Sequence, residues 1–97
     1  MAKTAKQAYN EIKAYMYNYS RLYAFWYVGI TSNPETRLFN DHGISERFDK
    51  WVCIECINSE SARNAEDALL RLGCDGGGGD ATSSYVYAYF KTLSSKP

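Results

Sequence analysis

Apolar residues recur along the N-terminal segment at alternating steps of four and three. This stripe consists of Ala5, Tyr9, Ile12, Met16 and Tyr19. Thr4 and Gln7 have the spacing of a capping box, in which two side chains satisfy backbone N–H groups at a helix start. Because steps of three and four keep residues on one helix face, we expect an amphipathic helix over residues 5–19.

Three later segments have the apolar pattern of strands. Aromatic and β-branched residues dominate YAFWYVGIT, residues 23–31. The segment WVCIECI, residues 51–57, is apolar on both faces, which predicts a central strand. In YVYAYFK, residues 85–91, every second residue is Tyr, which predicts a half-buried strand. Its three tyrosines, Tyr85, Tyr87 and Tyr89, are expected on one face.

A short helix is expected directly after the first strand. Asn33 offers an N-cap side chain, and Pro34 suits the first helical position because its missing N–H is not needed there. Gly43 suits the left-handed conformation that ends many helices. The sequence therefore predicts a helix that ends near His42.

A third helix is expected after the second strand, and it completes the order α-β-α-β-α-β. Asn58 or Ser59 offers its N-cap, and Gly73 follows its last apolar residue. Its apolar stripe consists of Ala62, Ala65, Leu69 and Leu72. We therefore expect one α+β domain over residues 1–97, with a small three-stranded sheet flanked by helices. The glycine-rich segment of residues 74–84 is expected to be a loop.

Composition and charge narrow the classes of protein that this chain can belong to. The formal net charge is zero, so any nucleic-acid site must be a local basic patch. No segment is apolar over the roughly 18 residues that a membrane span requires, so no membrane association is expected. The three cysteines are an odd number, and the polar N-terminus lacks a signal-peptide core, which together predict reduced thiols and a cytoplasmic location.

The segment YVGITSNPETRLFNDH resembles the second half of the signature of GIY-YIG nucleases. Its matching residues are Tyr27, Val28, Gly29, Thr31, Arg37 and His42. A later helical segment, SARNAEDALL, resembles the family's metal-binding helix through Ala62 and Glu66. The resemblance covers about residues 25–72 and implies a GIY-YIG-like fold for this region.

The chain departs from the family pattern because no Gly-Ile-Tyr strand precedes Tyr27 at the usual distance. The family's late Asn also has no clear counterpart after Glu66. A permuted arrangement would restore the first strand: residues 85–91 would pair with residues 23–31. Tyr85, Tyr87 or Tyr89 would then replace the missing Tyr, and Tyr87 is the candidate we include in the site.

The resemblance implies a metal-dependent phosphodiesterase or nuclease site. Glu66 would bind Mg²⁺ or Mn²⁺, and Arg37 would bind a phosphate with its planar, permanently charged fork. Tyr27, His42 or Tyr87 would orient or deprotonate the attacking water. The alternative is an inactive relative that binds a nucleotide, a nucleic acid or a protein partner. Such a relative, or a self-associating module, would use a Tyr-rich surface.

Each of these residues also has a purely structural interpretation. Tyr27 would be an ordinary strand aromatic, and His42 would be a buried histidine at a helix end. Arg37 and Asp41 have the spacing of a surface ion pair on one helix. Glu55 is an alternative carboxylate to Glu66, because it follows Trp51 and Cys53 on one strand face.

Two other motifs suggest chemistry that their context does not favour. Cys53 and Cys56 lie three apart on a predicted strand and so face opposite sides, which favours buried thiols over a zinc site. The segment DGGGGD lacks the Gly-Lys-Ser/Thr ending of a phosphate-binding loop and precedes a strand. It is expected to be a flexible linker, although its backbone could form one wall of a nucleotide pocket.

Overall fold

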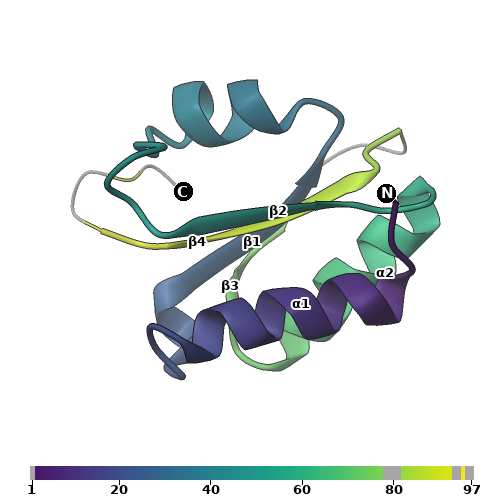
Figure 1. Ribbon diagram of the computed structural model, residues 1–97, viewed down its shortest axis with the longest axis horizontal. Coiled ribbons are helices and arrows are strands. Elements are labelled where there is room, and N and C mark those ends of the chain that lie inside the picture. Colours follow the sequence, from purple (N-terminus) through teal and green to yellow (C-terminus); the bar gives the residue numbers. More distant parts are fainter. Residues whose placement is uncertain (1, 78–81, 93–94, 96–97) are drawn as a thin grey trace.

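A computed structural model of the protein describes residues 2–77, 82–92 and 95 (Figure 1). Its helical elements are α1 (Ala5–Tyr17), the short 3₁₀ turn η1 (Tyr23–Phe25), η2 (Thr36–Asp41) and α2 (Ser59–Arg71). Its strands are β1 (Trp26–Thr31), β2 (Trp51–Glu55), β3 (Asp75–Gly76) and β4 (Tyr85–Phe90). These elements form a small α+β body with extents of 32 × 26 × 22 Å.

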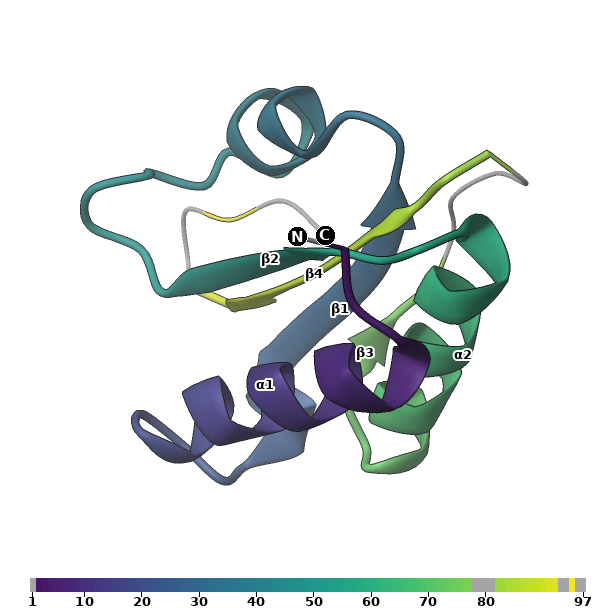
Figure 2. The same ribbon diagram turned by 45° about the vertical axis from the view of Figure 1, so that its right-hand side comes forward.

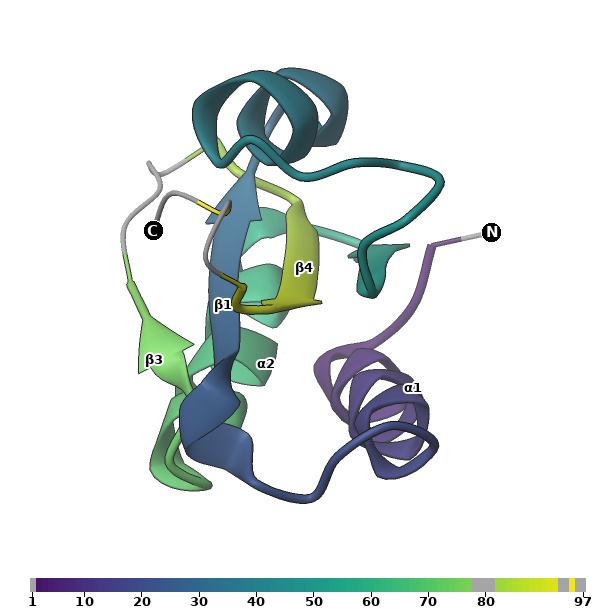
Figure 3. The ribbon, with the colours of Figure 1, turned by 90° about the vertical axis from the view of Figure 1, so that its left-hand side faces the viewer.

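The four strands form one mixed sheet in the order β2-β4-β1-β3. The last strand, β4, is antiparallel to both β1 and β2, and Tyr27 lies opposite Tyr89 while Gly29 lies opposite Tyr87. Figure 3 shows β1 between β4 and β3. The predicted pairing of the final strand with residues 23–31, which places a Tyr beside Tyr27, is therefore confirmed.

Three sequence-based expectations about the sheet were wrong. It has four strands, because Asp75–Gly76 of the expected loop pairs in parallel with β1, as Figure 2 shows. The segment expected as the central strand, β2, lies at an edge. The last strand, β4, was expected to be half-buried, but Val86, Tyr87, Ala88 and Tyr89 bury both of its faces. Apolar residues on both faces of β2 reflect the layers above and below it, and they carry no information about its lateral neighbours. The remainder of the glycine-rich motif, residues 78–80, lies outside the described residues.

The sheet lies between two layers of different construction. Helices α1 and α2 cover one face, and the segment that contains η2 covers the other (Figure 1). The α1/α2 layer packs against even-numbered residues of the inner strands: Trp26, Val28, Ile30, Val86 and Ala88. The opposite layer contains a smaller cluster of Leu38, Ile44, Tyr87 and Tyr89. Alternation along β1 and β4 therefore sends their odd-numbered side chains toward η2.

The two long helices begin at the residues that the sequence indicates. The Thr4–Gln7 capping box is formed, and Asn58 caps α2 by accepting a 2.8 Å hydrogen bond from the Ser61 N–H. The first helix ends at Tyr17, two residues before the expected end. No helix among the described residues is long and apolar enough to cross a lipid bilayer.

The helix expected after β1 is present, but most of it is a π-helix. Asn33 accepts a 3.2 Å hydrogen bond from the Thr36 N–H, and Gly43 has φ 67°, as the sequence predicted for the two ends. Between them the His42 N–H donates to the Arg37 carbonyl, five residues earlier, at 3.0 Å. This wider turn changes the directions of the side chains that follow it, and π-turns are frequent at functional sites.

Candidate functional site

The strand register brings three tyrosines to the sheet face beneath η2. Tyr27 of β1 stacks on Tyr89 of β4, with ring centroids 5.3 Å apart and planes 23° apart. Tyr87 follows on the same face of β4, and it is 1% exposed. Because both strands contribute odd-numbered residues, one pairing pattern positions all three rings.

His42 connects two of these tyrosines through its two ring nitrogens. Its Nε2 lies 2.8 Å from the Tyr87 hydroxyl, and its Nδ1 lies 3.0 Å from the Tyr89 hydroxyl. A neutral imidazole has one donor and one acceptor nitrogen, so one tyrosine donates to the ring and the other accepts from it. The interpretation of His42 as a buried histidine at a helix end is correct, and its partners are the tyrosines of the candidate site.

Arg37 approaches the same Tyr87 hydroxyl from the start of η2. Interaction with this hydroxyl raises the pKa of the guanidinium. Arg37 Nη1 also lies 3.5 Å from Asp41 Oδ2, so the i,i+4 ion pair expected from the sequence is present. Within the described part of the chain, however, the Nε of Arg37 is buried and has no hydrogen-bond partner. The surface pair therefore leaves part of the Arg37 fork free for another acceptor.

Tyr27 provides the more accessible hydroxyl of the site. Its side chain is half-buried, and its hydroxyl donates to the Gly77 carbonyl at 3.3 Å. Its ring also contacts the His42 ring, with centroids 4.9 Å apart. Tyr27 is thus both a packed strand aromatic and a member of the cluster, so the two interpretations of its role are compatible.

Glu66 adds a buried carboxylate from the opposite side of the sheet. It lies on the inner side of α2, and its side chain is 6% exposed. Its Oε2 has no hydrogen-bond partner among the residues that the structure describes. Burial, with a smaller effect of Asp67, raises the pKa of Glu66 to about 7, although Arg63 opposes the change. A buried carboxylate oxygen without a partner is costly and requires a cation, a donor or a proton.

The Tyr27 and Tyr87 hydroxyls lie within the fields of both Arg37 and Glu66. Burial is the largest influence on both hydroxyls; it raises the pKa of Tyr27, and it raises that of Tyr87 to about 12. In each case Arg37 lowers the pKa and Glu66 raises it. The two charges act on the same hydroxyls from two elements, and each retains a buried atom without a partner in the described residues.

The structure thus brings together the candidate residues Tyr27, Arg37, His42 and Tyr87, with Glu66 close enough to influence both tyrosines electrostatically. It adds Tyr89, which the sequence offered only as one of three alternatives for the missing Tyr. The other carboxylate candidate, Glu55, is exposed on the edge strand.

The three tyrosines of β4 form no open surface, because Tyr87 and Tyr89 are almost fully buried. Tyr87 and Tyr89 therefore pack within the protein and do not contribute to a Tyr-rich binding surface.

A metal ion at this site would rely on one protein carboxylate. No group of three or more His, Cys, Asp or Glu side chains in the described residues has the geometry to hold a metal. Mg²⁺ commonly binds proteins through one or two carboxylates and retains several waters, so the unpartnered Oε2 of Glu66 fits this mode. All three cysteines are free thiols, and Cys53 and Cys56 belong to no group of three or more metal-ligating side chains in the described residues.

Comparison with known proteins gives no match to a family model, to a curated protein or to a solved structure.

Proposed function

We propose that this protein is a permuted, GIY-YIG-like phosphodiesterase domain that acts on a nucleic acid or nucleotide with Mg²⁺ or Mn²⁺. The observation that carries the proposal is the pair of buried side-chain atoms without a partner in the described residues, Arg37 Nε and Glu66 Oε2, on the two residues whose charges influence the Tyr27 and Tyr87 hydroxyls. These two charged residues come from separate elements, and each has a buried atom without a partner in the described chain. A phosphodiester and its metal ion would supply both missing partners.

The residues would divide the chemistry as follows. Arg37 would bind the phosphoryl oxygens, since its guanidinium is planar and permanently charged. Glu66 would hold the divalent ion, which neutralises charge on the phosphate and the leaving oxygen. Tyr27, as the accessible hydroxyl, would orient the attacking water. The His42–Tyr87–Tyr89 cluster would fix the Tyr27 ring and the Arg37 fork in place.

A second candidate function is binding without hydrolysis, and one observation favours it. Burial raises the pKa of Tyr27 and raises that of Tyr87 to about 12, so both hydroxyls stay protonated near neutral pH and neither is available as a general base. In this case the same Arg37 and Glu66 would bind a nucleotide or nucleic acid.

For either function we predict a cytoplasmic location, because the three cysteines are free thiols.

Metal-dependent cleavage assays with two glutamate variants separate these functions. Labelled single-stranded and duplex oligonucleotides are incubated with millimolar Mg²⁺ or Mn²⁺ and with wild type, Glu66→Gln or Glu55→Gln. Glu55→Gln is the matched control, because its carboxylate is exposed on β2. We expect cleavage by wild type and Glu55→Gln, and its loss in Glu66→Gln. Binding without cleavage by wild type would support the second function. Cleavage that survives Glu66→Gln, or the absence of both binding and cleavage, would overturn the proposal.

A further inference from the structure

Positive charge is concentrated in the first helix and the turn that follows it. Residues 1–25 contain four Lys or Arg and one Glu, so they carry a net charge of +3, and the remainder of the neutral chain carries −3. The only acidic residue in this segment, Glu11, is 3.3 Å from Lys3 in an ion pair. The neutral net charge of the protein therefore conceals a local basic region.

Aromatic rings are interleaved with these cations around the C-terminal half of α1. Lys13 Nζ lies 5.6 Å from the Tyr9 ring centroid and 5.8 Å from that of Tyr17. Arg21 lies 5.0 Å from the Tyr17 ring, and Lys50 Nζ lies 4.9 Å from the Tyr19 ring. We call this set the α1 surface: Tyr9, Lys13, Tyr17, Tyr19, Arg21 and Lys50.

Two rings of the α1 surface, Tyr17 and Tyr19, are open to solvent, whereas Tyr9 is half-buried against the core. Tyr17 is 46% exposed and Tyr19 is 51% exposed, and they are followed by Leu22, which is 61% exposed. Aromatic side chains that alternate with basic residues on an exposed surface are the components that bind single-stranded nucleic acid. Bases stack on the rings, and phosphates contact the cations.

We propose that the α1 surface binds single-stranded DNA or RNA, independently of any hydrolysis at the candidate site. A duplex fits less well, because its bases are stacked inside and cannot reach the tyrosine rings. A membrane also fits less well, because the apolar residues of α1, Ala8, Ile12 and Met16, are buried in the core. Helix α1 covers the sheet face opposite the segment that contains η2 (Figure 1).

The number of cations sets the expected salt dependence. If Lys13, Arg21 and Lys50 each neutralise one phosphate, the logarithm of the binding constant should fall against the logarithm of salt concentration with a slope of about −2 for a single strand. Removal of two of these charges should reduce the slope to about −0.7. A slope of this size distinguishes a local patch from a general electrostatic attraction, which a neutral protein does not provide.

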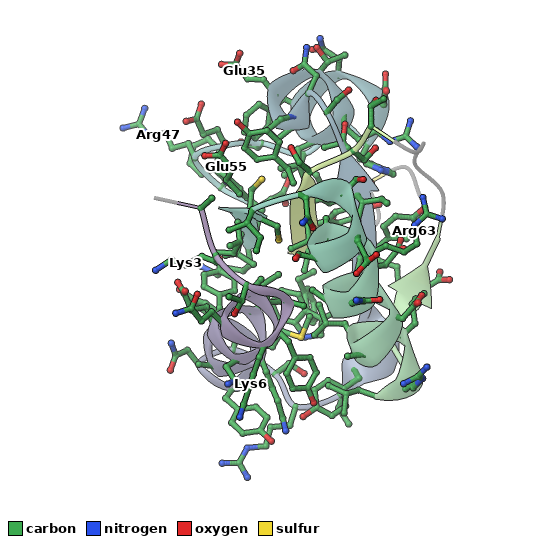
Figure 4. The ribbon with its side chains drawn as sticks, turned by 90° about the vertical axis from the view of Figure 1, so that its right-hand side faces the viewer. Lys3, Lys6, Glu35, Arg47, Glu55 and Arg63 are labelled. Atoms are coloured by element: carbon green, nitrogen blue, oxygen red, sulfur yellow. The ribbon has the colours of Figure 1, made fainter. Side chains whose placement is uncertain are left out.

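Fluorescence anisotropy with a labelled single strand of about 12 nucleotides tests the proposal, in EDTA so that metal-dependent chemistry plays no part. Arg21→Gln is compared with Arg47→Gln, its matched control. Arg47 is also exposed and also lies over an aromatic ring, Phe48, at 5.9 Å. Figure 4 shows Arg47 toward the end of the molecule opposite Lys6 of α1. Lys13→Gln/Arg21→Gln and Tyr19→Ser complete the set, and circular dichroism verifies that each variant is folded.

We expect Lys13→Gln/Arg21→Gln to bind at least about tenfold more weakly than wild type, with the smaller salt slope, and Tyr19→Ser to bind about fivefold more weakly even in high salt. Arg47→Gln should bind like wild type. Equal losses for Arg21→Gln and Arg47→Gln would overturn the proposal, as would tighter binding of the matched duplex. Binding of anionic vesicles or an acidic peptide without binding of the single strand would assign the surface to another partner. Loss of cleavage with retained binding here would affect only the proposed function.

Discussion

The hydroxyl of Tyr87 occupies the space next to Gly29 that a side chain would need. A β-carbon added to Gly29 would lie 2.5 Å from the Tyr87 hydroxyl oxygen and 2.7 Å from its Cζ. Gly29 is not among the glycines with positive φ, so its backbone conformation does not require glycine. Glycine is needed at this position because the Tyr87 ring crosses β1 there, on the way to His42 and Arg37.

The first prediction concerns this close approach. Gly29→Ala should lower the free energy of unfolding by about 1–3 kcal/mol, because a methyl group overpacks the site and displaces the Tyr87 ring. Urea denaturation of Gly29→Ala, Tyr87→Leu and the double variant measures the effect. The shorter Leu should relieve the clash, so Gly29→Ala should cost less in the Tyr87→Leu background. The same cost in both backgrounds would contradict the proposed contact.

The second prediction concerns the hydrogen bond between His42 and Tyr89. His42→Leu leaves the buried Tyr89 hydroxyl without the 3.0 Å partner, which should cost about 1–3 kcal/mol for that hydroxyl in addition to any packing loss. Tyr89→Phe removes the hydroxyl, so His42→Leu should be less costly in that background.

A double-mutant cycle by chemical denaturation measures the coupling energy between His42 and Tyr89, for which we expect about 1 kcal/mol. Tyr85→Phe serves as the control, since Tyr85 is the first residue of β4 and Tyr89 lies near its other end. Additive costs would show that the hydrogen bond contributes nothing.

The sequence predicted the elements that depend on local signals. Capping side chains at Thr4 and Asn58 and the alternation in β4 act within a few residues, so their outcome follows from short patterns. The pairing of β4 with β1 was predicted from the absence of an N-terminal strand. The position of β2 at an edge was not, because lateral order depends on contacts between distant segments.

The site was predictable to a similar extent. Tyr27, Arg37 and His42 belong to one continuous motif, so the strand and the following helix bring them together. The sequence could not decide between Tyr85, Tyr87 and Tyr89, because the choice depends on the register between β1 and β4. It also could not predict the π-turn, in which His42 bonds to Arg37 five residues earlier.

The third prediction concerns the pH dependence of stability. Because the pKa of Glu66 is raised from 4.5 to about 7 in the folded protein, the folded state binds this proton more tightly than the unfolded chain. The Glu66 contribution to the free energy of unfolding should therefore fall as the pH rises from about 4.5 to about 7, by at most about 3 kcal/mol. Glu66→Gln should remove this dependence, and Glu55→Gln should retain it. Denaturation at pH 5 and pH 8 tests this, and equal pH profiles for wild type and Glu66→Gln would contradict it.

The fourth prediction concerns metal binding in the same pH range. A divalent cation competes with the proton for Glu66, so millimolar Mg²⁺ should raise the melting temperature of wild type more at pH 8 than at pH 5. Glu66→Gln should abolish this gain, while Glu55→Gln should keep it. Thermal unfolding with and without Mg²⁺ measures the shift, and NaCl at the same ionic strength controls for general ionic effects. An equal gain in Glu66→Gln would place the ion elsewhere.

The last prediction concerns Arg37, which either binds phosphate or serves only its ion pair with Asp41. If Arg37 only pairs with Asp41, Arg37→Lys should bind nucleotide and nucleic acid like wild type. The exposed ion pair contributes less than about 1 kcal/mol to the stability of the fold, and in this case it takes no part in ligand binding. If Arg37 binds phosphate, Arg37→Lys retains the charge but loses the planar fork, so binding should weaken. We expect the weaker binding, because the Nε of Arg37 is buried without a partner in the described residues and a Lys side chain has no equivalent donor there.

Titration of wild type, Arg37→Lys and the control Arg47→Lys with a nucleoside diphosphate decides between the two roles. The small ligand reports on the candidate site rather than on the α1 surface. Equal affinities for all three proteins would assign Arg37 to its ion pair and remove it from the site.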